Sequence, residues 1–342
     1  MENNNFITLI TDSDLIFYYT NFRIEDGFLV IHGEDKFLYT DKRYYSSAMK
    51  TARATVRLID TSSLEFLLDE LNVKRVGILY PLTSVEFYEK LKALSVEIFN
   101  AYDLVIDKTS VKSLEEIHLI KNSCAVLEKS LKKALNSLTE GISENEFAGL
   151  IEYNFKLFGA EKPAFDTIVA FGEGTAVPHY KTGNVLLKKN MPVLIDCGCV
   201  VNGYNSDITR SFYYGNAPKN YKDAFSAVLN AHFLALNCIS PNMLGKEADA
   251  ISRNYLISKG YGEYFTHSLG HGVGVKVHEF PTLSPKSEFV LRNGNVFSIE
   301  PGVYFDNKFG IRIEDTVYLE NGKVKSFFNL DKTGMGFNPS VN

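Results

Sequence analysis

The chain has 342 residues, of which 45% are hydrophobic and 23% charged, so it is long enough for two domains that each bury a core. Its formal net charge is −5 and it contains no basic run or stripe, which argues against a nucleic-acid partner. No apolar run approaches the ~20 residues that cross a bilayer, and the N-terminal MENNNFITLITDSD lacks the basic and apolar regions of a signal peptide, so we expect a cytoplasmic protein with no membrane partner.

The N-terminal third alternates segments typical of strands and of helices. The sequence FLVIHGEDKFLYT, residues 28–40, predicts two strands around a polar turn that contains glycine. Residues 62–72 begin with serines and carry leucines at helical spacing, whereas residues 73–80 and 94–100 are again typical of strands. These features predict an α/β domain over residues 1–110.

Two helices with capping-box patterns are expected next. Ser113 precedes Glu116 by three residues, and apolar residues then recur at helical spacing as far as Leu131. Ser143 and Glu146 form the same pattern at the start of a second predicted helix.

The rest of the chain is rich in strands, with one pair of helices inserted between them. Such an order is typical of an α+β domain, which we expect to span residues 111–342. Strands are expected at residues 167–172, 185–200 and 204–215 and again toward residue 330, and helices at 224–239 and 247–260.

Single acidic residues stand on or at the ends of these apolar strands. Asp196 ends the run MPVLID, and Glu300 ends VFSIE just before a Pro-Gly pair. Asp207 lies within NSDITRSF, and Glu314 shares a strand face with Arg312. A buried carboxylate is costly unless it is paired or binds a metal, so on spacing alone structural salt bridges and a metal site both stay open. Four carboxylates with one imidazole would suit two hard or borderline divalent ions.

The segment FTHSLGHGVGVKVHEFP, residues 265–281, contains three of the chain's seven histidines. His267 and His271 have the i,i+4 spacing of zinc ligands on a helix, but no glutamate follows the first one. Glycines disfavour a helix in this segment, so we expect extended structure instead. The glycines concerned are Gly270, Gly272 and Gly274.

Four separated segments resemble, in order, the metal-binding segments of the pita-bread metallopeptidases: IDCGCVVNGYNSDITR, HSLGHGVGVKVHE, SIEPGVY and IRIEDTV. This family includes the Xaa-Pro aminopeptidases, the prolidases and the methionine aminopeptidases. The resemblance spans about residues 112–330, and its histidine-rich segment is more similar to the Xaa-Pro branch. It implies an α+β fold in which a C-terminal pita-bread domain follows a smaller N-terminal α/β domain, itself similar to the creatinase-type domain of that branch.

The resemblance also implies two divalent metal ions and five ligands. Asp196 would bind one ion, His271 with Glu300 the other, and Asp207 and Glu314 would bind both. All five residue types stand at the matching positions, so the resemblance predicts an intact metal site. Manganese is the ion that we expect, with cobalt or zinc as alternatives.

The expected reaction is attack of a metal-bridging hydroxide on the carbonyl before proline. Glu300 would act as general base and proton carrier, and His278 would stabilise the oxyanion. His267 and His179 would line the substrate pocket, and Arg312 would orient the bridging carboxylates.

Two weaker expectations concern the surroundings of the ligands. Tyr204 and Thr209 flank Asp207, and we expect them to hydrogen-bond to ligands. The glycines of the histidine-rich segment are expected to let the backbone approach the metals and the substrate closely.

For the function we favour an Xaa-Pro aminopeptidase, a hydrolase that acts on peptides with proline at the second position. The alternative is an Xaa-Pro dipeptidase, or prolidase, which accepts dipeptides only. A non-catalytic pita-bread module that binds peptides or proteins is disfavoured because such modules usually lack several ligands. Creatine hydrolysis is disfavoured because that chemistry does not need the ligand set. The resemblance further implies a homodimer.

Overall fold

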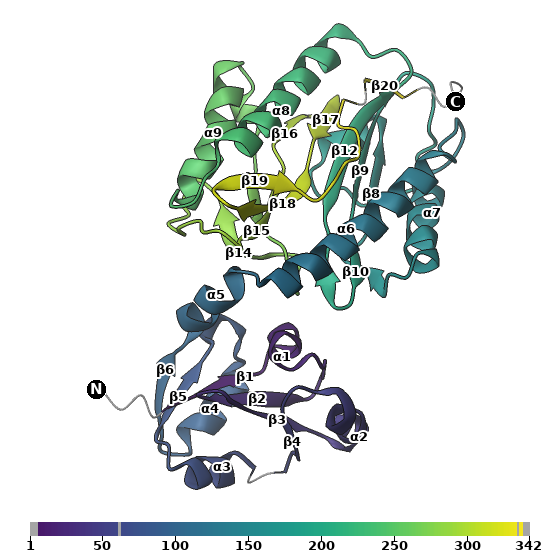
Figure 1. The fold of residues 1–342 in the computed structure, drawn as a ribbon. Helices are drawn as coiled ribbons and strands as arrows, with labels where there is room; N and C mark the ends of the chain where they lie inside the picture. The colour runs from purple at the N-terminus through teal and green to yellow at the C-terminus, as the bar shows by residue number, and fades with distance from the viewer. Residues whose placement is uncertain (1–5, 61–62, 334, 338–342) are drawn as a thin grey trace. The chain divides into compact units, whose positions relative to one another are not determined.

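The computed structural model describes residues 6–60, 63–333 and 335–337 (Figure 1). The chain divides into two compact units, Met1–Thr109 and Ser110–Asn342, and each unit has a hydrophobic core of its own. Among the described residues, no helix combines the length and the apolar composition needed to cross a membrane.

The first unit is built on a six-stranded mixed sheet in the order β4-β3-β2-β1-β5-β6. The β1–β2 and β2–β3 pairs are antiparallel, and the other three pairs are parallel. The strands are β1 (Phe6–Ile10), β2 (Gly27–His32), β3 (Asp35–Thr40), β4 (Thr55–Leu58), β5 (Arg75–Ile78) and β6 (Glu97–Asn100). The helices are α1 (Ser13–Thr20), α2 (Lys42–Thr51), α3 (Ser63–Leu71), α4 (Val85–Lys92) and α5 (Tyr102–Ser110), the last of which ends at the first residue of the second unit.

Both faces of this sheet are buried. In β2, Phe28 and Val30 join a core cluster with Leu67 of α3, whereas Leu29 joins a second cluster with Ile16 of α1. This alternation is what a strand covered on both faces requires. The predicted α/β character, the hairpin at 28–40 and the helix at 62–72 are therefore confirmed.

Four long helices form two pairs that flank the strands of the second unit (Figure 1). They are α6 (Leu114–Leu135), α7 (Glu144–Leu157), α8 (Lys219–Cys238) and α9 (Gly245–Ser258). Both predicted capping boxes are present: the Glu116 amide donates to Ser113 Oγ at 3.2 Å, and the Glu146 amide donates to Ser143 Oγ at 3.2 Å. Helix α8 begins earlier than predicted, at Lys219, and Pro218 precedes it as an N-cap residue without a side-chain cap hydrogen bond.

The strands of the second unit form two main sheets. One has the order β20-β12-β9-β8 and the other the order β14-β13-β15-β18-β19, and short strands form a three-stranded sheet and a hairpin beside them. The strands are β7 (Lys162–Pro163), β8 (Ile168–Phe171), β9 (Met191–Cys197), β10 (Cys199–Val201), β11 (Tyr204–Asn205), β12 (Ile208–Tyr214), β13 (Gly270–Gly272), β14 (Glu279–Leu283), β15 (Val296–Ile299), β16 (Gly302–Phe305), β17 (Phe309–Arg312), β18 (Asp315–Glu320), β19 (Lys323–Ser326) and β20 (Met335–Phe337).

The two main sheets meet where β12 and β18 begin. Thr316 Oγ1 donates to the carbonyl oxygen of Asp207 at 2.8 Å, and the Glu314 amide donates to the carbonyl oxygen of Thr209 at 3.1 Å. Within the second sheet, Ile299 of β15 pairs with Asp315 of β18. The residues just outside these strand ends are therefore brought to one place.

Some predicted strand positions differ from the structure. Asp207 and Glu314 lie immediately before the first residue of a strand, and Glu300 lies immediately after the last residue of one. The run at 185–187 was expected to open a long strand, but Leu186 makes only an isolated bridge to Ser143. The predicted α+β architecture of this unit is confirmed.

Candidate metal centre

The predicted site residues share one cavity of about 1160 Å³ in the second unit. The five predicted ligands lie on or directly beside β9, β12, β13, β15 and β18, which come from four separate parts of the sequence. The cavity lining includes the five predicted ligands and four further predicted residues: Asp196, Asp207, His271, Glu300, Glu314, His179, His267, His278 and Arg312.

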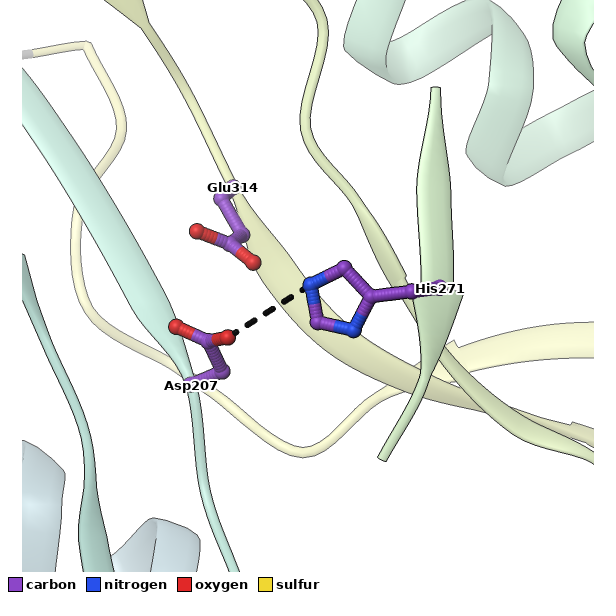
Figure 2. A group of neighbouring side chains, drawn as sticks. All are labelled: Asp207, His271 and Glu314. Atoms are coloured by element: carbon purple, nitrogen blue, oxygen red, sulfur yellow. Dashed lines mark ion pairs between the residues drawn. The ribbon is translucent and has the colours of Figure 1, made fainter. Parts of the chain in front are cut away.

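Asp207, His271 and Glu314 form the tightest group. One ligand atom from each lies within 4.8 Å of the others, and Figure 2 shows the His271 ring directed from β13 toward the two carboxylates. His271 Nε2 lies 3.7 Å from Asp207 Oδ2 and 3.3 Å from Glu300 Oε1. Asp196 lines the same cavity from β9 and accepts a hydrogen bond from Arg312.

Several carboxylate oxygens at the site are buried without a hydrogen bond. Within the described residues, Asp196 Oδ1, Asp207 Oδ1 and Glu314 Oε1 have no hydrogen-bond partner. Buried polar atoms are normally satisfied, and an unsatisfied carboxylate oxygen is costly unless a cation faces it. Oxygen-rich donors with one imidazole are the set that divalent ions take, so these residues fit divalent ions.

The carboxylates also raise one another's pKa. Burial, and then the charge of Glu314, hold the pKa of Asp207 well above its usual range. Burial, and then the charge of Glu300, do the same to the pKa of Glu314. Burial raises the pKa of Glu300 to about 7, although Arg312 opposes the shift. A cation placed among them would relieve this repulsion.

His271 has the protonation state that a metal ligand needs. Its Nδ1 lies 3.1 Å from the carbonyl oxygen of Gly272, so the proton belongs on Nδ1 and Nε2 keeps its lone pair toward the carboxylates. Burial lowers the pKa of the ring, which favours the neutral form. Ser298, which the sequence did not single out, accepts from the His271 amide and donates to Glu300 Oε1, both at 3.0 Å. Ser298 stands two residues before Glu300, and side chains two positions apart on a strand share a face, which is the sequence signal that could have identified it.

Arg312 lies at the centre of a buried polar network. Its Nη2 donates to Asp196 Oδ2 at 2.6 Å and its Nε donates to Thr209 Oγ1 at 3.1 Å. Arg312 therefore holds Asp196 directly and reaches Glu314 through Thr209, whose hydroxyl donates to Glu314 Oε2 at 2.6 Å. The Tyr204 hydroxyl donates to Glu116 Oε1 at 3.3 Å, and its expected contact with a ligand stays a prediction.

Tyr304 is a second residue that the sequence did not single out. Its hydroxyl accepts from Arg312 Nη1 at 2.6 Å and lies 3.0 Å from His267 Nε2. The other ring nitrogen of His267 lies 2.9 Å from the carbonyl oxygen of Ser268. Both nitrogens of His267 are thus engaged, and burial lowers the pKa of the ring to about 3, so the ring is neutral.

His278 differs from His267 because its ring makes no hydrogen bond with any residue that the structure describes. It lies beside His271, with 4.2 Å between the ring centroids, and burial lowers its pKa to about 4. His179 lies in a turn and is exposed at the cavity lining. His278 therefore lies beside the ligand His271 with its ring nitrogens free of hydrogen bonds to the described residues.

Two glycines of the histidine-rich segment serve strand packing, and their expected role in letting the backbone approach metal and substrate stays a prediction. A Cβ on Gly270 would lie 2.0 Å from the carbonyl oxygen of Ser298 in β15. A Cβ on Gly272 would lie 2.3 Å from the carbonyl oxygen of Phe280 in β14. Strand β13 fits between its two neighbours only because these positions lack side chains.

Comparison with known proteins identifies related domains over nearly the whole chain. Residues 118–321 match metallopeptidase family M24, and residues 6–109 match the creatinase/prolidase N-terminal domain. A curated Xaa-Pro dipeptidase from Pyrococcus horikoshii is 39% identical over 298 residues, which are 86% of this chain and 85% of the relative.

Two solved structures are similar over almost their full lengths. The prolidase from Pyrococcus furiosus superposes with a TM-score of 0.88 at 34% identity, covering 95% of this chain and 96% of that one. The X-Pro aminopeptidase from Thermotoga maritima has a TM-score of 0.88 at 30% identity, covering 96% and 97% respectively.

Proposed function

The chain belongs to metallopeptidase family M24, and on that premise we propose that it is an Xaa-Pro dipeptidase, or prolidase, that works with two divalent metal ions. The preference for a dipeptidase replaces the aminopeptidase expected from the sequence. It is supported by the names of the Pyrococcus relatives. The observation that carries the enzyme assignment is the meeting of four carboxylates and His271 in one cavity, with three buried carboxylate oxygens left without hydrogen bonds among the described residues.

The proposed ligand assignment is the one that the family resemblance implies, and the shared cavity supports it. Asp196 would hold one ion, His271 and Glu300 the other, and Asp207 and Glu314 both. When bound, the ions would supply Lewis acidity and a water of lowered pKa. We propose manganese, because an oxygen-rich site with one imidazole suits hard or borderline ions, with cobalt or zinc as alternatives.

Glu300 is the group proposed to carry the proton. Its Oε1 accepts from Ser298 at 3.0 Å, whereas its Oε2 lies 3.9 Å from His267 Nδ1. Oε2 would take the proton of the attacking water and pass it to the proline nitrogen, which has no hydrogen of its own and must gain one before it leaves. Ser298 keeps the carboxylate turned in one direction during this transfer.

His278 is the group proposed to stabilise the oxyanion. It is neutral, it lines the cavity and its ring nitrogens are free of hydrogen bonds with the described residues. A positioned N–H donor is most effective where negative charge develops in the transition state. His267, engaged at both nitrogens, would shape the pocket wall together with His179, and Arg312 would hold Asp196 in place.

The test is turnover by metal-depleted protein after manganese, cobalt or zinc is added singly. Substrates are Ala-Pro, Ala-Pro-Ala and Met-Ala-Ser. The proposal expects cleavage of Ala-Pro with at least one metal and little or no cleavage of the tripeptides. Absence of any turnover with every metal would contradict the enzyme assignment.

An Xaa-Pro aminopeptidase is the second candidate. The observation in its favour is the similarity to the X-Pro aminopeptidase structure, which is as close in TM-score as that to the P. furiosus prolidase. Cleavage of Ala-Pro-Ala at a rate comparable with Ala-Pro would favour it. A homodimer and a cytoplasmic location stay predictions from the sequence.

A further inference from the structure

A lysine and a glutamate form a buried ion pair behind the wall of the cavity. The side chain of Lys112 is 1% exposed and that of Glu279 is 13% exposed, and the Lys112 ammonium donates to Glu279 Oε1. Neither residue lines the cavity, but Glu279 directly follows His278. A buried lysine is uncommon and needs a partner of opposite charge, which Glu279 provides for Lys112.

Lys112 is held in place through the backbone around it. Its amide donates to the carbonyl oxygen of Gly294 at 2.8 Å, and Asn295 Nδ2 donates to the carbonyl oxygen of Ser110 at 2.9 Å. Gly294 has φ +88°, and a Cβ there would lie 2.8 Å from Val111 Cγ1. The first residues of the second unit are thus packed onto the segment that precedes β15, and the ammonium has a defined position.

The carboxylate of Glu279 is the centre around which the loop 274–278 folds. The Lys276 amide donates to Glu279 Oε2 at 3.1 Å. A Cβ on Gly274 would lie 2.6 Å from Glu279 Oε1, so the backbone at Gly274 passes close to the carboxylate. The loop therefore packs around a negative charge that Lys112 neutralises.

Asn205 holds the same loop from the ligand side. Its Nδ2 donates to the carbonyl oxygens of Gly274 and Val275, both at 3.0 Å, and its amide donates to that of Gly274 at 2.8 Å. Asn205 is buried and stands two residues before Asp207. One end of the loop is therefore fixed to the segment that carries Asp207, and the other end is fixed to the Lys112–Glu279 pair.

We propose that the Lys112–Glu279 ion pair is a positioning device for His278, which sets the imidazole against His271 by fixing the loop 274–278. The inference rests on the proposed function in so far as His278 acts on the substrate. Neither charged group touches the cavity, so both act through the loop. Loss of the lysine charge leaves a buried carboxylate unpaired, and the loop must move to let it reach water.

The experiment compares full-length wild type with Lys112→Met and with the double variant Lys112→Met/Glu279→Gln, all loaded with manganese. The control is Lys246→Met, which removes the same charge from an exposed pair with Glu288, whose side chains are 40% and 70% exposed. The readouts are bound metal per chain, kcat and KM for Ala-Pro, and amide hydrogen exchange of residues 274–279.

Lys112→Met is expected to lower kcat at least about tenfold, because a small misplacement of a catalytic group lowers the rate strongly. KM and metal content should stay close to wild type. Faster exchange should be confined to the loop. The double variant should recover both properties toward wild type, because no buried charge is left and the amide oxygen still accepts from the Lys276 N–H.

The proposal is overturned if Lys112→Met matches Lys246→Met in loop exchange, or if the double variant is no better than the single one. Should Lys112→Met prove insoluble, Glu279→Gln replaces it: a loop exchange and a kcat equal to wild type would then overturn the proposal. If wild type cleaves no peptide before proline, the proposed function fails, and the exchange pattern still decides whether the ion pair positions the loop.

Discussion

The hydroxyl of Thr209 donates a hydrogen bond to Glu314 Oε2 at 2.6 Å, between two residues 105 positions apart in the sequence. Both side chains are buried, and Thr209 also accepts from Arg312 Nε at 3.1 Å. The other oxygen, Glu314 Oε1, has no hydrogen-bond partner in the part of the chain that the structure describes. Thr209 therefore determines which oxygen of Glu314 stays available to a cation.

Thr209→Val should weaken metal binding. The substitution keeps the shape of the side chain but leaves Glu314 Oε2 without its donor, so the carboxylate loses its fixed orientation. Loss of such an orienting bond typically lowers metal affinity by about 10- to 100-fold, and we expect a change in this range by calorimetric titration with manganese. Thr51→Val, at an exposed helix position, is the matched control and should titrate like wild type. Equal affinities for the two variants would contradict the role of Thr209.

Arg312→Met should destabilise the protein strongly. The guanidinium is the partner of the buried Asp196 carboxylate, and removal of one member of a buried ion pair costs about 3–5 kcal/mol because the other charge stays behind. Arg312→Lys should not rescue the protein, because one ammonium cannot reproduce the separate bonds to Asp196, Thr209 and Tyr304.

The measurement for Arg312 is urea unfolding of the metal-free protein. Lys219→Met is the control, since its pair with Asp223 is exposed and should contribute little. An unfolding free energy for Arg312→Met equal to that of this control would show that the network around Arg312 does not stabilise the fold.

Glu300→Gln should remove most of the activity without unfolding the protein. The amide oxygen can still accept from Ser298, but the side chain can no longer take a proton from water. Loss of a general base usually lowers the rate by about 10²- to 10⁴-fold, and we expect kcat for Ala-Pro to fall in this range. The thermal midpoint of the metal-free variant, measured in parallel, should be no lower than that of wild type. Activity within about tenfold of wild type, or about 1.4 kcal/mol in barrier height, would exclude Glu300 as the proton carrier.

The metal-free protein should lose stability as the pH rises, through its buried carboxylates. Burial raises the pKa of Asp207 above its usual range and that of Glu300 to about 7, so the folded state holds more protons than the unfolded state between about pH 4 and about pH 7. With more protons bound in the folded state, the unfolding free energy falls with increasing pH. Bound manganese takes the place of those protons and should reverse the trend.

Asp207→Asn isolates this effect from buried histidines such as His232, whose lowered pKa has the opposite sign. In chelator, the thermal midpoint of the variant should exceed that of wild type by a margin that grows from about pH 5 to about pH 7.5. With manganese present, the variant should be the less stable protein. A margin in chelator that shrinks with pH would contradict the proposed repulsion.

Local features of the chain were predictable because their causes are local. The Ser113 and Ser143 capping boxes involve residues three positions apart, and both are present. The hairpin at 28–40 follows from two apolar runs around a polar turn. The start of α8 and the isolated bridge at Leu186 were missed, since helix starts and strand pairing depend on neighbours far away in the sequence.

By itself, the sequence determined the residue types of the candidate site and the family, because metal binding restricts carboxylates and an imidazole to particular motifs: Asp196, Asp207, His271, Glu300 and Glu314. Only the tertiary structure decided their partners. Which strands lie side by side decides that Thr209 donates to Glu314 and that Tyr304 joins Arg312 to His267. It also decides that Gly270 makes room for a neighbouring strand. No periodicity within one segment carries that information, because these contacts form only when the two sheets of the second unit meet.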